Sequence, residues 1–505
     1  MGLERHNFWL VFLYLTRSLQ LNGKRFQILV CAIGQSAIAQ SVGTQQCIVR
    51  SCALAWMRTA RLKTDQMQKF RESAITVGAI AVLSVQPLFT QIEPLLAQPA
   101  QLQPKSTNRA SSFRLPAPTG SYQVSTTAYY LVDTSRKEIY STEVYDLRTR
   151  KPITTPPPTD RRELMVYVWY PTNAKPGAST APYMDEGFAL AAAEGMGRDF
   201  GVSSDQFVQS VTQTIQTNAV PKVAIANASK RYPVVILSPG FGSTPKFYTT
   251  QLEQLASHGY VVVAINPTYE VPVLFPDGRV ITQSTVFNFS KADQAKIQRT
   301  FNQAVEIRAK DVSFVLNELN RLNIKDAQGL FSGRLDLNRV GIFGHSLGGD
   351  TAIEAVWRDR RLKAGINMDG GSYGKLLGSG NKDRLDSPFL LMSHDGSDQA
   401  LQSFYQRLRT NAYSLTLKGS KHNTFIDFGV ILPAFSANST TQAESRIKQA
   451  LGSIEPQRAA KIINVYTLAF FNKYLKNQRE PLLDRGSSDY PEVLLESRGK
   501  LSNKF

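Results

Sequence analysis

The chain has 505 residues, of which 42% are hydrophobic, and it carries a formal net charge of +18. Its length leaves room for more than one domain, and its apolar content is enough to bury a large core. A basic balance suits nucleic acid or an anionic membrane surface. The sequence has no long lysine–arginine run, no zinc-ligand spacing and no nucleic-acid module. We therefore predict scattered surface charge and no nucleic-acid partner.

Apolar runs near the N-terminus indicate a targeting region. Phe8–Leu15 and Phe26–Ile33 are each too short to span a bilayer. A third pattern begins at Met67, where basic residues precede the apolar run Ala74–Phe89 and small residues follow near Ala97. This order is typical of an export signal. We predict an exported protein, periplasmic or secreted, with Met67 as an alternative true start. A rival cleavage-like site at residues 37–39 and membrane anchoring by this segment both stay open.

All three cysteines, Cys31, Cys47 and Cys52, precede Met67. A chain that starts after them has no disulfide, no thiol nucleophile and no thiolate metal site. Residues 101–118 are rich in proline, serine, glutamine and threonine, which predicts a linker. We assign residues 1–110 to this signal region and linker, outside the fold, and residues 111–505 to the folded domain.

Residues 119–171 are rich in β-forming runs. Tyr122–Val124, Tyr129–Val132 and Leu164–Tyr170 have strand character. Their alternating and apolar patterns predict an antiparallel edge on a larger sheet. Residues 184–231 instead show helical patterning. We predict a helical insertion there, either a cap over a site or ordinary surface helices.

The run Tyr232–Ser238 is too continuous for a strand with one exposed face, which predicts a buried parallel strand. It leads into the loop Gly240-Phe241-Gly242. In an α/β hydrolase this loop supplies one backbone amide for an oxyanion, and the residue after the nucleophile supplies the other. Phe241 is the candidate donor here. The loop lacks the spacing of a nucleotide-binding motif, so we predict no nucleotide.

Strands and helices alternate through the rest of the domain. This order predicts an α/β fold with a mostly parallel, doubly wound sheet, as in the α/β hydrolases. Strands are expected at Tyr260–Asn266, Val340–Phe343, Lys363–Met368, Pro388–Met392 and Ser414–Leu417, and helices at Leu252–His258, 291–323 and Ile462–Tyr474.

The strand Val340–Phe343 leads into Gly344-His345-Ser346-Leu347-Gly348, a G-x-S-x-G motif. A serine on a tight strand-to-helix turn needs glycine two residues before and after it, because a Cβ there would clash. The helix that starts near Leu347 favours negative charge at its N-terminus. We predict Ser346 as a nucleophile, with the backbone amides of Phe241 and Leu347 as the oxyanion hole.

A serine nucleophile needs a base. In this fold class the order is serine, acid, histidine. Of the five histidines, only His394 and His422 follow Ser346. His422 lies in a polar, glycine-containing loop after the last expected strand. His394 ends an apolar strand close in sequence to the serine. We predict His422 as the base and His394 as a structural or supporting histidine.

Candidate acids follow two neighbouring strands. Asp369 follows residues 364–368, and Asp395 and Asp398 follow residues 389–392. Each could orient the imidazole of the base. General α/β-hydrolase topology favours the later position, so residue patterns alone leave the choice open.

Several segments together resemble the plasma-type platelet-activating-factor acetylhydrolase family. In that family the acid lies on the strand directly after the nucleophile helix, which implies Asp369, with Asp395 as the runner-up. The resemblance covers roughly residues 118–430. Its segments are Gly120–Val124, Leu131–Asp133, Arg162–Pro171, Ser238–Gly242, Leu255–Val262, Gly344–Gly349, Ile366–Asp369 and Gly419–Phe428.

The resemblance implies calcium-independent hydrolysis of short or oxidised acyl esters, typically the sn-2 acyl group of phospholipids, with no metal or cofactor. Residues 184–231 and 429–460 depart from the family pattern and could reshape the acyl pocket. We therefore predict a serine carboxylic-ester hydrolase that acts through an acyl-enzyme on an ester or lipid substrate.

Three alternatives use the same fold. A cutinase-like polyester hydrolase, a peptidase or an acyltransferase needs the same three side chains, since fold and triad do not set the substrate. A non-catalytic binding module is disfavoured because all three candidates are present. The apolar run Phe428–Phe435 offers peripheral membrane contact, or it forms core or pocket lining.

Overall fold

The computed structural model describes residues 16–21, 24–29, 112–149, 151–153, 159–175, 177–290, 292–371, 373–375, 385–395, 399–435 and 440–499. The chain divides into two compact units, Met1–Gln91 and Ile92–Phe505. In the first, β1 (Thr16–Leu21) pairs antiparallel with β2 (Lys24–Leu29). The predicted export signal, its cleavage sites and the cysteines lie outside the described residues. Among the helices that are described, none has the length and apolar character needed to cross a membrane.

The second unit is built on a ten-stranded sheet with the order β17-β16-β15-β14-β13-β9-β10-β6-β4-β8. The strands from β16 to β10 run parallel to one another. On one side β6 and β4 continue the sheet antiparallel, as predicted, and on the other β17 closes it antiparallel. The bounds are β4 Gln123–Lys137, β6 Arg161–Thr172, β8 Ala219–Pro221, β9 Tyr232–Ser238, β10 Val261–Ile265, β13 Leu335–His345, β14 Leu362–Met368, β15 Phe389–His394, β16 Ala412–Leu417 and β17 Val493–Arg498.

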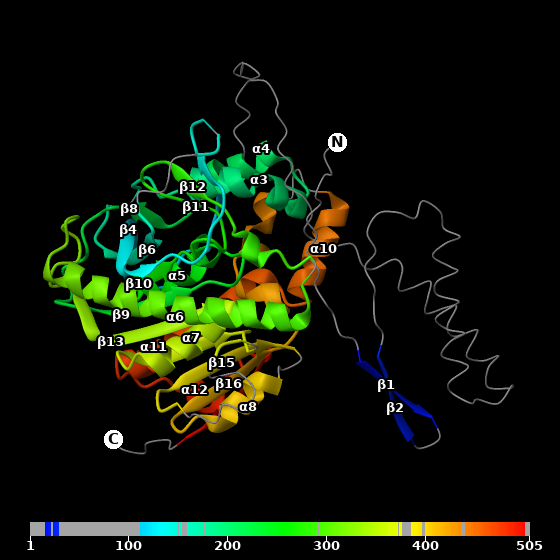
Figure 1. The fold of residues 1–505 in the computed structure, drawn as a ribbon. Helices are drawn as coiled ribbons and strands as arrows, with labels where there is room; N and C mark the ends of the chain where they lie inside the picture. The colour runs from blue at the N-terminus through cyan, green and yellow to red at the C-terminus, as the bar shows by residue number, and fades with distance from the viewer. Residues whose placement is uncertain are drawn as a thin grey trace, which may run out of the picture. The chain divides into compact units, whose positions relative to one another are not determined.

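Helices cover both faces of this sheet (Figure 1). On β9, Val235 and Leu237 pack into one core and Val234 and Ile236 into the other, because successive side chains point to opposite faces. The first core includes residues of α5 (Thr249–Ser257) and α11 (Pro456–Leu475), and the second includes residues of α6 (Gln294–Ile324), α7 (Leu347–Arg358) and α8 (Gln399–Arg407). The predicted doubly wound α/β-hydrolase fold is confirmed.

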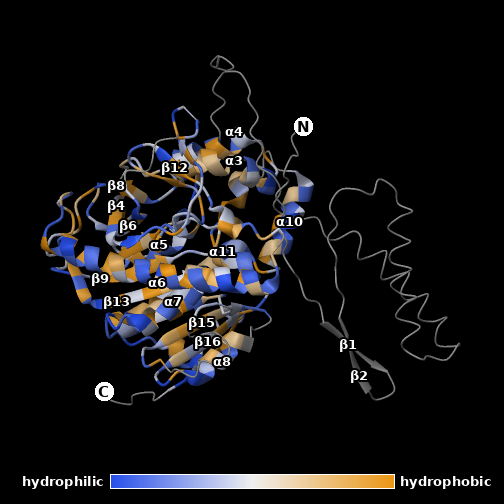
Figure 2. Ribbon diagram, viewed as in Figure 1, coloured by the Kyte–Doolittle hydropathy of each residue, from blue (hydrophilic) through white to orange (hydrophobic). Residues whose placement is uncertain are grey.

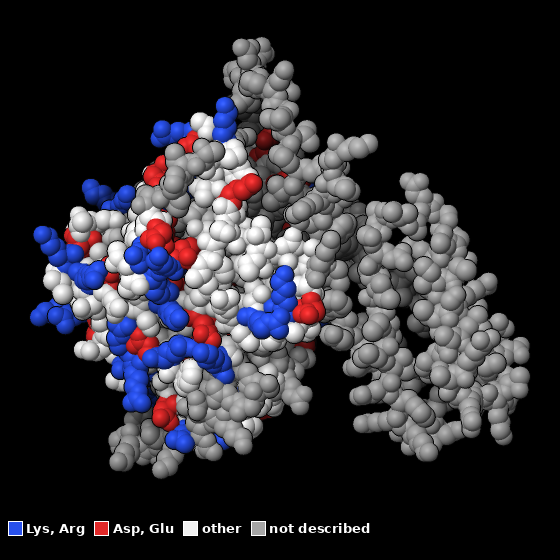
Figure 3. All heavy atoms as spheres, in the orientation of Figure 1, with Lys and Arg blue, Asp and Glu red and all other residues white. Residues whose placement is uncertain are grey.

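Hydropathy and charge follow the same layers. Hydrophilic and hydrophobic residues alternate along α6, as expected for a helix with one buried face (Figure 2). On the face drawn in Figure 3, basic side chains are interspersed with acidic ones. This distribution fits the scattered surface charge expected from the sequence.

The insertion at 184–231 is only partly helical. It begins with α3 (Glu186–Phe200), α4 (Ser204–Gln209) and the π-helical turn η1 (Ser210–Thr214). It then forms β7 (Ile215–Gln216) and β8, and β8 extends the main sheet by pairing with β4. The buried Glu253 fixes this edge by accepting the backbone N–H groups of Asn218 and Ala219. The sequence prediction missed these strands because they are too short to show a period.

Two further segments complete the unit. The run Phe428–Phe435 forms α9 (Phe428–Ile431) and η5 (Leu432–Ala434), and its Val430, Ile431 and Phe435 side chains lie in the first core. The remaining elements are β3 Phe113–Arg114, β5 Val144–Asp146, β11 Val273–Leu274, β12 Arg279–Ile281, η2 Pro245–Tyr248, η3 Thr285–Phe287, η4 His422–Phe425, α10 Thr441–Leu451 and α12 Leu482–Arg485.

Candidate active site

Ser346 occupies the turn between β13 and α7. Its backbone has φ 54° and ψ −126°, a conformation that residues with a Cβ rarely adopt. Neighbouring backbone holds the turn, since Ser346 N donates to Met368 O at 2.8 Å and Ser346 O accepts from Gly349 N at 2.8 Å. The serine is therefore presented, half-buried, at the start of a helix.

The flanking glycines are required by close approach. A Cβ on Gly344 would lie 2.0 Å from Gly348 O, and one on Gly348 would lie 1.9 Å from Ser238 O. Real Cβ atoms do not come so near a carbonyl oxygen. The steric reason given for the motif is confirmed by these distances.

The other candidate residues follow the strands next to β13. Asp369 comes directly after β14, His394 ends β15, and His422 follows β16 by a short loop. These strands are parallel neighbours, so their carboxyl ends meet at one edge of the sheet. Parallel pairing of four consecutive strands thus brings Ser346, Asp369, His394 and His422 to one edge of the sheet.

Asp369 bonds to His422. The distance from His422 Nδ1 to Asp369 Oδ2 is 2.5 Å. Only 6% of the Asp369 side chain is exposed, compared with 47% for His422. Because Nδ1 faces the carboxylate, it carries the proton and leaves Nε2 as the basic nitrogen. The runner-up acid, Asp395, is exposed and instead accepts Gly419 N at 2.5 Å.

A second histidine bonds to the same carboxylate. His394 Nδ1 lies 2.7 Å from Asp369 Oδ1, and His394 N donates to that oxygen at 3.0 Å. Burial opposes ionisation of Asp369, but hydrogen bonds from His394 and His422 outweigh it and hold its pKa well below the usual range. The hydrogen bond to Asp369 raises the pKa of His394. The carboxylate is therefore charged and fixed from two sides.

Asp369 itself has a left-handed backbone, with φ 57°. Aspartate tolerates this region better than most residues, but the conformation still needs support from its surroundings. Asp369 N donates to Met392 O at 2.8 Å, and His394 grips the side chain. The strand β15 thus holds both the backbone and the carboxylate of the candidate acid.

Two buried side chains hold the loop that contains Phe241. Arg308 Nη1 donates to Pro239 O at 2.5 Å and forms an ion pair with Glu270. On the amide side, Gly240 N donates to Tyr248 Oη at 2.9 Å. The peptide that joins Pro239 to Gly240 is therefore held at its oxygen and at its N–H by side chains from α6 and η2.

Aromatic side chains surround Phe241. Its ring lies 4.9 Å, between centroids, from Phe301 of α6, and Phe301 lies 4.9 Å from Tyr373, four residues after Asp369. Phe287 and Phe289 complete the group. Phe241, Phe301 and Tyr373 are half-buried. An aromatic wall thus runs from the candidate oxyanion loop, Gly240-Phe241-Gly242, to the loop after the candidate acid.

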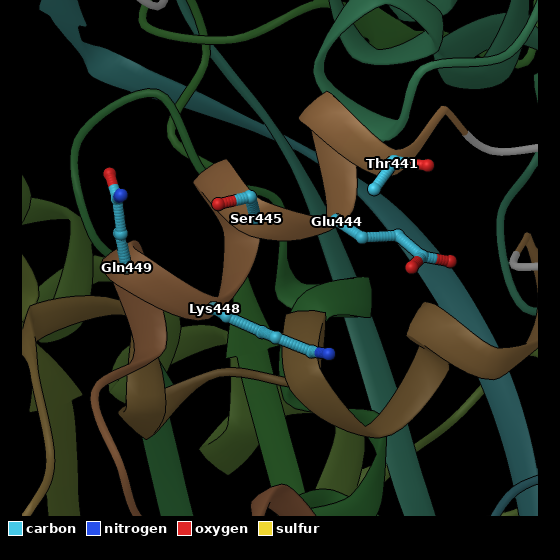
Figure 4. Close-up of a pocket in the computed structure, with 5 residues that line it drawn as sticks. All are labelled: Thr441, Glu444, Ser445, Lys448 and Gln449. Atoms are coloured by element: carbon cyan, nitrogen blue, oxygen red, sulfur yellow. The ribbon is translucent and has the colours of Figure 1, made fainter.

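No group of three or more His, Cys, Asp or Glu side chains that could hold a metal ion occurs in the described part of the chain. A hollow of about 420 Å³ lies against α10 (Figure 4), and all its lining residues come from that one helix. None of the candidate residues lines it, so we do not connect it with the chemistry. The lining residues are Thr441, Glu444, Ser445, Lys448 and Gln449.

Sequence reasoning missed two residues that the structure places around the site, Tyr248 and Arg308. It predicts a structural or supporting role for His394 but does not name its partner, which in the structure is Asp369. The position of His394 at the end of a strand next to that of Asp369 was a usable signal. Tyr248 and Arg308 gave none, because each contacts the site through folding of distant segments.

Comparisons with known proteins identify the relatives of this chain. The family model described as platelet-activating factor acetylhydrolase, isoform II, matches residues 158–489. A probable 1-alkyl-2-acetylglycerophosphocholine esterase of Arthroderma benhamiae is 28% identical over 397 residues, which are 76% of this chain and 94% of that protein. The platelet-activating factor acetylhydrolase of Cavia porcellus is 25% identical over 264 residues, 49% of this chain and 58% of its own length.

A solved structure extends the comparison. The ferulic acid esterase from Streptomyces cinnamoneus superposes with a TM-score of 0.61 at 30% identity. The match covers 76% of this chain and 99% of that one.

Proposed function

This chain belongs to the platelet-activating factor acetylhydrolase, isoform II, family and is an ester hydrolase, and from that premise we propose how its residues act. Ser346 is the nucleophile, His422 the base and Asp369 the acid that orients it. The amides of Phe241 and Leu347 form the oxyanion hole. The observation that carries the proposal is the 2.5 Å contact between His422 and Asp369 beside the strained turn at Ser346.

The reaction proceeds in two halves. Ser346 Oγ attacks the ester carbonyl while His422 Nε2 takes its proton and passes it to the leaving alcohol. Water then attacks the acyl-enzyme, with His422 again as base. Asp369 remains ionised and stabilises the imidazolium that forms in each half. Each oxyanion-hole amide contributes on the order of 3–4 kcal/mol of transition-state stabilisation.

We propose short or oxidised acyl esters as the substrate class, including the sn-2 acyl group of a phospholipid. The name of the Arthroderma benhamiae relative, an alkyl-acetylglycerophosphocholine esterase, supports this choice. No step in the scheme requires a metal or a cofactor.

The first test is hydrolysis of p-nitrophenyl esters from acetate to palmitate in the presence of EDTA. The second is hydrolysis of a 1-alkyl-2-acetylglycerophosphocholine. We expect the rate to peak at short chains and to fall by at least ~10⁴-fold in Ser346→Ala. Ser313→Ala, which removes a hydroxyl on α6 that bonds Asp359, is the matched control. A substantial rate in Ser346→Ala would contradict the assignment.

The aromatic wall favours a second substrate class, esters of aromatic acids. Its rings stand next to the backbone amide assigned to the oxyanion, and the ferulic acid esterase shares the fold at 30% identity. Hydrolysis of methyl ferulate compared with methyl hexanoate separates the two classes. If the wall binds the acyl group, Phe301→Ala will lower the rate on the ferulate more than on the hexanoate.

Export and membrane contact are also proposals. The N-terminal pattern beginning at Met67 supports export, and the N-terminal sequence of the protein recovered from cells would test it. Within the run Phe428–Phe435 the side chains of Val430, Ile431 and Phe435 are buried, which does not favour docking through them. Co-sedimentation with anionic vesicles, compared with a variant lacking residues 1–110, would separate contact by the domain from contact by the N-terminal segment.

A further inference from the structure

One chain of hydrogen bonds joins three loops of the site through Tyr248 and His345. Gly240 N lies 2.9 Å from Tyr248 Oη, and Tyr248 Oη lies 3.0 Å from His345 Nδ1. His345 Nε2 lies 3.0 Å from the backbone oxygen of His422. The chain therefore runs from the oxyanion loop, through the residue before the nucleophile, to the residue assigned as base.

The chemistry of its ends fixes the direction of every bond. A backbone carbonyl only accepts, so His345 Nε2 must carry a proton to bond His422 O. Burial lowers the pKa of His345 to about 3, so the ring is neutral and Nδ1 is bare. Tyr248 must then donate to Nδ1. Its oxygen keeps its lone pairs for the N–H of Gly240, and each group in the chain is satisfied in only this order.

We propose that Tyr248 and a neutral His345, protonated at Nε2, are positioning residues. They hold the loop that contains Phe241 and the loop that contains His422 at a fixed spacing on either side of Ser346. Neither side chain is assigned contact with the substrate. The proposal rests on the roles proposed above for Ser346, His422 and Phe241, and it adds the device that sets the spacing of those loops.

The location of these hydrogen bonds explains why they affect the reaction. Because the Gly240 N–H donates to Tyr248, the peptide between Pro239 and Gly240 has a fixed orientation, and the peptide that carries the Phe241 N–H is the next one along the backbone. The His345 and His422 rings lie 4.6 Å apart between centroids. A charged His345 would disfavour the imidazolium that His422 forms in each half-reaction, whereas a neutral ring permits it.

Removal of the tyrosine hydroxyl tests the chain. Tyr248→Phe leaves the ring packed but removes one acceptor and one donor. We expect kcat for p-nitrophenyl acetate to fall on the order of 10-fold to 100-fold with little change in KM, because the loops lose alignment but the pocket stays. The matched control is Tyr232→Phe, which removes a buried hydroxyl that donates to Ala226 O at 2.8 Å, outside the site. This control should lose comparable thermal stability and keep kcat.

Substitution of the histidine tests the direction of the bonds. Glutamine can accept from Tyr248 with Oε1 and donate to His422 O with Nε2, so His345→Gln should retain most of kcat. His345→Leu has a similar volume but neither group and should lose as much as Tyr248→Phe. Tyr248→Phe combined with His345→Leu should be no worse than His345→Leu alone, because both break one chain.

The ring nitrogens of His345 provide a readout that needs no catalysis. Nitrogen-15 NMR of the full chain, assigned by comparison with His345→Gln, should show Nε2 protonated and Nδ1 bare at neutral pH. A charged ring or an Nδ1–H tautomer would overturn the proposal, and so would wild-type kcat in Tyr248→Phe. If the wild-type protein hydrolysed no ester, the proposed function would fail. The tautomer of His345 would still decide whether the hydrogen bonds from Gly240 to His422 form as described.

Discussion

The carboxyl edge of the sheet and the α6 face of its antiparallel side each bury an aspartate, but they surround it with different partners. At the edge, Asp369 bonds two half-exposed histidines and sits in a left-handed backbone conformation. On the other side, Asp311 of α6 bonds Arg162 at 2.8 Å and Arg136 at 2.7 Å, and Arg162 is 3% exposed.

The difference lies in what the partners can do. Arginine stays charged at any pH that a protein survives, so the Asp311 pairs have one state. Histidine changes charge near neutrality, so the partners of Asp369 can gain or lose a proton. A buried aspartate is therefore paired with fixed charges in one region and with titratable groups in the other.

The sharpest way to break this comparison is Asp369→Asn. Asparagine tolerates the left-handed backbone, so the fold should persist. Catalysis should fall by ~10⁴-fold, because the amide no longer holds the proton on His422 Nδ1. Steady-state hydrolysis and thermal unfolding measured on the same preparation check both parts. If Asp395→Asn showed the larger loss, the runner-up would be the acid.

Asp311→Asn is the counterpart on the other side. It leaves Arg162 and Arg136 with less counter-charge in a buried site, which costs about 3–5 kcal/mol of folding free energy. The activity of each folded molecule should not change. Urea unfolding measures the first effect, and active-site titration with a fluorophosphonate normalises the second. A variant as stable as the wild type would show that the ion pairs contribute little net stability.

Two glycine-to-alanine substitutions separate the effect of a steric clash of the new Cβ from the effect of a positive φ angle. Gly348→Ala places a Cβ 1.9 Å from Ser238 O and should cost about 2–3 kcal/mol and most of the activity, since the elbow must move relative to the oxyanion loop. Gly329→Ala has φ +71° but no atom within 4 Å, so it should cost only about 1 kcal/mol and no activity. Equal effects of the two on kcat would contradict the steric account of the elbow.

The smallest expected effect is a pH dependence. His394→Asn keeps a neutral donor near the position of Nδ1 but removes the titratable charge. Because the pKa of His394 is raised on folding, its contribution to stability is full below about pH 6.5 and is lost as the pH rises through the folded value. The wild type should therefore exceed the variant in Tm at acidic pH, and the gap should close in alkali.

A second histidine gives the opposite sign. Burial, and then the charge of Lys476, lower the pKa of His258, so the neutral form is favoured by folding. The Tm of His258→Asn should therefore improve relative to the wild type as the pH falls below about 6.5. A parallel response of the two variants would show that neither pKa shift acts as described.

The extent of prediction from sequence differed between these regions. The parallel sheet and the turn at Ser346 could be predicted from the sequence, because the alternation of strands and helices and the glycines around Ser346 are local patterns. The edge strand β17 was missed because most of its residues are exposed and show no apolar run. The partners of Asp311 were missed as well, since β4, β6 and α6 meet only in the folded chain.

The acid shows the limit most clearly. Asp369 and Asp395 follow neighbouring parallel strands, and their local sequences are equally suitable. A family resemblance was needed to choose between them, and that role stays a prediction until the variants are measured. Tyr248 lay beyond prediction because its partners, Gly240 and His345, are set by loop closure.

The grip of His394 on Asp369 makes the site suitable for chemical rescue. If His422 is removed, the carboxylate keeps two hydrogen bonds from His394, through its backbone and its ring. The side chain of His422 is 47% exposed, so its removal opens a space that solvent reaches. A small diffusible base such as imidazole could enter His422→Ala, meet a carboxylate already in place and restore part of the rate. A soluble base would then replace the side chain of His422 in the reaction.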